Sequence, residues 1–126
     1  MARMIASFSG CDRDALADIV GLMKALRRAS TAAGATGLQS AEERFTPDGF
    51  VAAVVTRESR ANLRTVPAHA ACFVEFRCGD GCDAEAFATE LGAYLRATGR
   101  RPHSTVAIHR APMKRLPGEE PIPRSA

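Results

Sequence analysis

The residues that could carry out acid–base or nucleophilic chemistry are few and are scattered along the chain. The three histidines are His69, His103 and His109, and their spacing forms neither an HxH nor an HxxxH pair. Two adjacent carboxylate pairs, Glu42-Glu43 and Glu119-Glu120, fall in segments that read as loops, where neighbouring side chains point apart. Phosphate-binding glycine loops and the nucleophile-elbow pattern do not occur. We therefore predict no catalytic residue, no metal ligand and no cofactor, and a protein that is not an enzyme.

The four cysteines give no clear metal-binding pattern. Cys78 and Cys82 are four residues apart around two glycines, and Cys11 and Cys72 are distant from them in the sequence. A structural zinc site usually has more tightly paired cysteines and often histidine partners. Free thiols in a reducing compartment are the simpler expectation, and the sequence leaves the role of the cysteines open.

Arginine is the main cation of this chain, which has a net charge of +3 and only two lysines among its 17 basic residues. The planar guanidinium group can pair with a phosphate through two hydrogen bonds. Basic residues collect in predicted connections and in the tail, where they can contact phosphates without reading a base sequence. We predict RNA contacts there, with a merely solvated surface as the alternative, for Arg57, Arg60, Arg64, Arg110, Lys114 and Arg115.

Hydrophobic periodicity predicts four strands and two helices. The strands are expected at residues 4–8, 50–56, 70–77 and 104–109. One helix is expected to begin after Asp12 and the other after Asp83, because an aspartate there can accept hydrogen bonds from the first turn. Residues 35–49 read as a long loop or an irregular edge, and residues 57–67 read as an exposed connection. No apolar run approaches the ~20 residues needed to span a membrane, so no membrane association is expected.

This order predicts an α+β fold of the ferredoxin-like, split βαβ (βαββαβ) kind, with a four-stranded antiparallel sheet and two helices on one face. Residues 1–111 would form a single domain, and residues 112–126 an extended C-terminal tail. The helix-free face of such a sheet is a docking surface. Phe73, Glu75 and Arg77 alternate onto that face, and we predict that they contact a protein partner.

Several short segments resemble the protein-six family of the small ribosomal subunit. Met1-Ala2-Arg3-Met4-Ile5 is similar to the family's first strand, Glu43-Arg44-Phe45 to part of its second, and residues 71–76 to its third. The resemblance implies a non-enzymatic protein that binds ribosomal RNA and a neighbouring small-subunit protein, without a small-molecule substrate. It adds Arg3 and Arg44 to the expected RNA ligands. An organellar ribosome, in the mitochondrial matrix, is favoured over a bacterial one.

Two other families have the same order of elements. The small-subunit protein-ten family has similar motifs at Arg44-Phe45-Thr46, Ser59-Arg60 and His69, and implies the same class of function. The lid domain of M20 metallopeptidases has a motif similar to Asn62, Pro67 and Arg77. That second resemblance implies a homodimerisation module without catalytic activity of its own.

Overall fold

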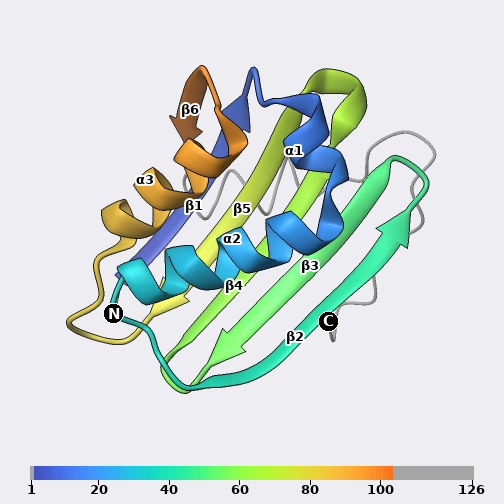
Figure 1. The fold of residues 1–126 in the computed structure, drawn as a ribbon. Helices are drawn as coiled ribbons and strands as arrows, with labels where there is room; N and C mark the ends of the chain where they lie inside the picture. The colour runs from blue at the N-terminus through green and yellow to red at the C-terminus, as the bar shows by residue number, and fades with distance from the viewer. Residues whose placement is uncertain (1, 104–126) are drawn as a thin grey trace.

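The structure is a computed structural model that describes residues 2–103. Six strands form one antiparallel sheet in the order β2-β3-β4-β5-β1-β6, and α1, α2 and α3 lie together on one of its faces (Figure 1). The elements are β1 Ala2–Ser9, α1 Arg13–Ala17, α2 Ile19–Ala32, β2 Leu38–Thr46, β3 Gly49–Thr56, β4 Ser59–Val66, η1 Pro67–His69, β5 Ala71–Cys78, α3 Ala84–Leu95 and β6 Gly99–Pro102.

The α+β class is confirmed, but the four-stranded ferredoxin-like sheet is wrong. Two of the segments that read as connections are strands: β2 occupies most of residues 35–49, and β4 occupies most of residues 57–67. In β4 the polar residues Arg60, Asn62 and Arg64 alternate with buried Ala61 and Leu63. That alternation is typical of a strand with one solvated face. The sequence was taken for a connection because the arginines make the segment polar and basic.

The hydrophobic core lies between the helices and the covered face of the sheet. Burial alternates along β3 and β5, so that every second residue packs against the helices. Phe76 of β5 stacks on Phe87 of α3 with ring centroids 4.1 Å apart, and both rings are completely buried. This packing fixes α3 against the middle of the sheet.

The first predicted helix is two helices that break at Asp18. The side chain of Asp12 accepts a hydrogen bond from the Ala15 amide and caps α1, as predicted, while Asp18 accepts from Gly21 and caps α2. After the break, Leu22, Ala25 and Leu26 of α2 are buried, whereas Val20 is 61% exposed. The cap predicted at Asp83 is confirmed.

The predicted strand at residues 104–109 and the tail at residues 112–126 lie outside the described residues, so the domain boundary at residue 111 stays a prediction. In the described part, the strand that pairs with β1 after α3 is β6. The helices of residues 2–103 include none that is long and apolar enough to cross a membrane.

Candidate functional site

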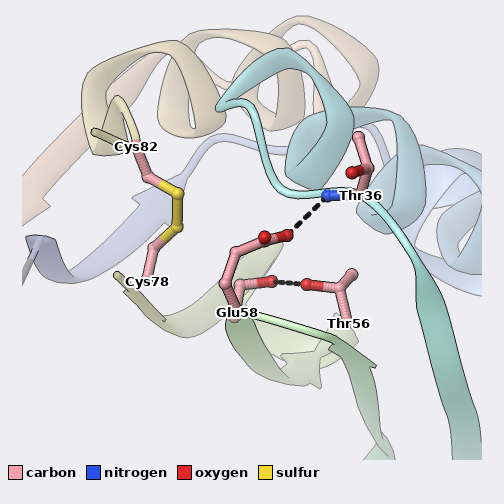
Figure 2. Close-up of a disulfide and its surroundings, with 6 residues drawn as sticks. Thr36, Thr56, Glu58, Cys78 and Cys82 are labelled. Atoms are coloured by element: carbon pink, nitrogen blue, oxygen red, sulfur yellow. Dashed lines mark hydrogen bonds between the residues drawn. A yellow bond between two sulfur atoms is a disulfide. The ribbon is translucent and has the colours of Figure 1, made fainter. Parts of the chain in front are cut away.

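Hydroxyl, carboxyl and sulfur groups gather at the end of the sheet where the β3–β4 turn meets the loop after β5 (Figure 2). We call this group the loop-end cluster, and its members are Thr36, Thr56, Glu58, Ser59, Cys78 and Cys82.

Backbone pairing brings the cluster together from three parts of the chain. The β4–β5 register places Ser59 opposite Cys78. The amide of Gly79 donates to the Glu58 carbonyl at 3.0 Å, which ties the loop after β5 to the β3–β4 turn. The amide of Thr36, in the loop after α2, donates to Glu58 Oε1 at 2.9 Å. The exposed Glu58 therefore connects two loops with its backbone and its carboxylate.

A pair of buried hydroxyl groups lies beneath this turn. Thr56 Oγ1 and Ser59 Oγ are 2.6 Å apart and hydrogen-bonded, and the two residues are only 6% and 7% exposed. One hydrogen bond between them gives each hydroxyl a partner, as is usual for buried polar groups.

The cysteines differ from the expectation of four free thiols. Cys78 and Cys82 form a disulfide that closes the loop between β5 and α3, with Cα atoms 6.0 Å apart. Cys11 and Cys72 are free and buried. Burial raises the pKa of the Cys11 thiol from 9.0 to about 11 and that of the Cys72 thiol well above its usual value. Both free thiols are therefore poor nucleophiles near neutral pH.

The open face of the sheet carries most of the residues predicted to contact a partner. The Glu75 carboxylate accepts from Arg3 at 2.8 Å and from Arg77 at 3.3 Å, so that β1 and β5 are joined by one carboxylate between two guanidinium groups. Arg60 lies opposite Arg77, and Arg64 opposite Phe73, along the β4–β5 register. That Phe73, Glu75 and Arg77 contact a protein stays a prediction.

The other predicted basic residues do not join this group. Arg44 lies on β2, at the far edge of the sheet. Arg57 is in the β3–β4 turn, where its amide donates to the Gly37 carbonyl at 3.0 Å. Arg110, Lys114 and Arg115 lie outside the described residues.

The open face also holds a serine–histidine pair that the sequence did not suggest. His103 Nε2 and Ser7 Oγ are 3.1 Å apart, which is within reach for a base and a hydroxyl nucleophile. Such a base also needs a group that orients it, and in residues 2–103 no side chain contacts the other ring nitrogen of His103. No three His, Cys, Asp or Glu side chains of this part of the chain gather to hold a metal ion.

The loop-end cluster was missed because its members come from separate segments. The only local signal is Cys78-Gly79-Asp80-Gly81-Cys82, in which two glycines allow a tight turn between two thiols. The hydroxyl pair gives no signal of its own, because the hairpin that joins Thr56 to Ser59 was not recognised.

Comparison with known proteins identifies related sequences along nearly the whole chain. A sequence model of the S-adenosylmethionine decarboxylase family matches residues 2–110. The S-adenosylmethionine decarboxylase proenzyme of Thermosipho melanesiensis is 33% identical over 81 residues, which are 64% of this chain and 62% of that protein. The corresponding proenzyme of Bacillus cytotoxicus is 30% identical over 107 residues, covering 81% of this chain and 82% of that protein. The chain thus matches less than two thirds of the length of the Thermosipho relative.

A solved structure agrees on the fold. The crystal structure of the adenosylmethionine decarboxylase from Aquifex aeolicus superposes with a TM-score of 0.69 and covers 80% of this chain and 84% of that chain. Its sequence is 17% identical, so this likeness concerns the fold alone.

These matches contradict the ribosomal interpretation. They name a family of enzymes that act on a small molecule, so the resemblance to the ribosomal protein-six and protein-ten families is wrong, and so are the ribosomal RNA and protein partners. The expectation of a non-enzyme is wrong for the same reason. A mitochondrial ribosome has no support, since the relatives are bacterial decarboxylases, and the M20 lid is not supported either.

Proposed function

Because this chain belongs to the S-adenosylmethionine decarboxylase family, we propose that it takes part in the removal of carbon dioxide from S-adenosylmethionine. The observation that carries the proposal is the extent of the family match. It runs from residue 2 to residue 110 and so includes the whole sheet, the three helices and the loop-end cluster. The relatives named as proenzymes of this reaction support the same substrate.

The reaction places one strong demand on any protein that performs it. Loss of carbon dioxide from an α-amino acid leaves an electron pair on the α-carbon, and a carbonyl group that has condensed with the substrate amine normally accepts it. None of the standard side chains carries a ketone or an aldehyde. The carbonyl must therefore come from a bound cofactor or from a chemical change in the protein.

The described residues do not fit an aldehyde cofactor held on a lysine of the loop-end cluster. The one lysine in residues 2–103 is Lys24, on α2, and it lines a shallow surface hollow with Arg27, Arg28 and Glu90. The loop-end cluster contains no amine. The names of the relatives call them proenzymes, a word for a precursor that is converted into the active form.

Charge at the loop-end cluster suits the proposed substrate. S-adenosylmethionine carries a sulfonium and an ammonium group, and both are attracted by carboxylates. Glu58, Asp80 and Asp83 are exposed around the two loops of the cluster. Glu58 is held in place by the Thr36 amide, so its charge is fixed at the surface rather than carried on a free side chain.

The test is release of labelled carbon dioxide from carboxyl-labelled S-adenosylmethionine by the full chain. We expect release above a protein-free blank, and we expect Glu58→Gln to raise KM more than it lowers kcat, because it removes a charge that attracts the substrate. Glu90→Gln, on α3, is the matched control: its carboxylate pairs only loosely with Arg28 at 3.8 Å, away from the loop-end cluster. Absence of both substrate binding and carbon dioxide release would refute the proposal.

A further inference from the structure

We propose that Arg60 and Arg77 bind the α-carboxylate of S-adenosylmethionine on the open face of the sheet, next to the loop-end cluster. The inference rests on the proposed function and adds to it a site that distinguishes the substrate from its product. Decarboxylation removes this carboxylate, whereas the product keeps the sulfonium and ammonium groups. A cationic site for the carboxylate therefore binds one molecule better than the other.

Three arginines form one row across β1, β5 and β4, and we call it the arginine row. Arg77 of β5 lies directly opposite Arg3 of β1 on one side and opposite Arg60 of β4 on the other. The helices α1, α2 and α3 lie on the other face of the sheet (Figure 1), and the three arginines are exposed. Like charges directly opposite each other destabilise a sheet, and an anion between them relieves the repulsion.

One carboxylate of the chain already compensates part of the row. Glu75 accepts from Arg3 at 2.8 Å and from Arg77 at 3.3 Å, so its carboxylate lies between the first two guanidinium groups. The row thus combines three cations with one anion, and the uncompensated end is Arg60.

Arg60 has no acidic partner of its own in the described part of the chain. Within residues 2–103 it forms no ion pair. The acidic residue closest to it in the sequence is Glu58, and that carboxylate accepts from the Thr36 amide at 2.9 Å (Figure 2). The Arg60 guanidinium is therefore available to an anionic ligand.

Glu75 indicates which kind of ligand fits between Arg60 and Arg77. It is a carboxylate held by two guanidinium groups on neighbouring strands, and Arg60 and Arg77 lie opposite each other on neighbouring strands in the same way. The bond to Glu75 uses Nε of Arg77, which leaves the terminal nitrogens of that group for a second carboxylate. A guanidinium group matches a carboxylate through two parallel hydrogen bonds.

The arginine row lies at the end of the sheet that carries the loop-end cluster. Ser59 and Cys78 of the cluster lie opposite each other, and they are the residues next to Arg60 and Arg77 in their strands. Consecutive residues of a strand are about 3.3 Å apart. A substrate held by its carboxylate at the row can therefore place its cationic groups near Glu58.

A carboxylate site of this kind affects binding rather than the chemical step. The negative charge leaves the carboxylate as carbon dioxide forms, so an arginine bound to it stabilises the bound substrate more than the transition state. Arg60 should therefore lower KM without raising kcat. The product has no carboxylate for Arg60 to bind, so it dissociates more easily than the substrate.

The test compares the affinities of the full chain for S-adenosylmethionine and for decarboxylated S-adenosylmethionine. They are measured as KM and product inhibition constant where the chain turns over, and by calorimetry where it does not. The wild-type chain should bind the substrate at least about tenfold more tightly than the product. Arg60→Gln should weaken substrate binding at least about fivefold, without lowering kcat, and leave product binding unchanged.

Two further variants complete the series. Arg60→Lys keeps the charge but loses the planar fork, so it should recover only part of the substrate affinity. Arg44→Gln, on β2 at the far edge of the sheet, is the matched control and should change neither affinity. Circular dichroism checks that each variant folds.

A chain that binds neither molecule, or an R60Q chain that binds both as the wild type does, would overturn the proposal. Equal weakening of both ligands would do the same, because it would show that Arg60 does not act on the carboxylate. Inorganic phosphate that binds through Arg60, without a preference for substrate over product, would assign the row to a separate oxyanion. If carbon dioxide is not released but the substrate preference depends on Arg60, the proposed function fails and the carboxylate site stands.

Discussion

Removal of the Ser59 hydroxyl tests whether the buried hydroxyl pair supports the loop-end cluster. In the folded chain Thr56 Oγ1 and Ser59 Oγ are 2.6 Å apart, at 6% and 7% exposure. Ser59→Ala leaves the Thr56 hydroxyl without this partner at a depth that water does not readily reach. The cost of an unsatisfied buried hydroxyl is about 1–3 kcal/mol of unfolding free energy.

A double-mutant cycle separates this bond from the loss of either side chain. Thr56→Val removes the other partner and should cost a similar amount, about 1–3 kcal/mol. With both hydroxyls gone, nothing is left unsatisfied, so T56V/S59A should be less destabilised than the sum of the two single variants. We expect a coupling of about 1 kcal/mol or more, because the residues are in direct contact.

Urea unfolding followed by circular dichroism measures the four free energies of the cycle. A loss of about 1 kcal/mol corresponds to a melting temperature lower by about 3–5 °C for a chain of this size. Thr89→Ala, which removes an exposed hydroxyl on α3, should change stability by no more than about 0.5 kcal/mol. Additive single variants, or an S59A chain as stable as T89A, would show that the hydroxyl pair does not stabilise this end of the sheet.

Three further predictions concern the cysteines and the proposed reaction. Reduction of the Cys78–Cys82 disulfide should lower the unfolding free energy by about 2 kcal/mol, which is the chain-entropy contribution of a loop this short. Reductant should not change the unfolding free energy of the Cys82→Ala variant, which has no disulfide to reduce. Because the folded-state pKa of Cys11 is about 11 against an ordinary 9.0, stability should be intact below pH 9 and fall as pH rises to 11. Cys11→Ala should flatten that fall in a pH series of urea unfolding, and an unchanged slope would contradict it. Cyanoborohydride with S-adenosylmethionine should reduce the imine and abolish carbon dioxide release. The species that bears the carbonyl should gain the mass of the substrate less one oxygen atom, because the imine forms with loss of water and its reduction adds two hydrogens. Activity that survives this treatment would exclude an imine.

The elements with strong local signals were predictable. The strand at residues 70–77 has clear alternation, and the helix after Asp83 has both periodicity and a capping residue; both are present in the structure. The end of that helix was less clear. It ends at Arg96, whose φ of 53° is a left-handed conformation that glycine usually adopts at a helix end.

The strands β2 and β4 were not predictable from hydrophobicity. β4 has arginine and asparagine on its solvated face, and β2 is an edge strand with no helix above it and hardly any buried residue. Polar composition suggested loops in both cases. Both strands pair with β3, which lies between them. Their conformation is therefore determined by contacts with another strand and not by the propensities of their own residues.

The placement of residues on the open face was predictable, but the loop-end cluster was not. The open-face group of Phe73, Glu75 and Arg77 followed from strand alternation, and the structure places all three on β5 with Glu75 paired to Arg77. The loop-end cluster did not follow from the sequence, because the contact between Ser59 and Cys78 depends on the β4–β5 register. A register cannot be read from a segment that is itself taken for a loop.

The failed prediction of a non-enzyme has a chemical cause. That prediction depended on the absence of a side-chain nucleophile beside a base, which is the arrangement that hydrolytic enzymes need. Decarboxylation of an amino acid depends instead on a carbonyl that no standard side chain contains, so a chain of this family can lack every such arrangement and still take part in catalysis. The small number of histidines and the burial of the free thiols of Cys11 and Cys72 are therefore no evidence that the chain lacks enzymatic activity. The decisive observation is whether the chain, under conditions of turnover, bears a carbonyl that the substrate amine can attack.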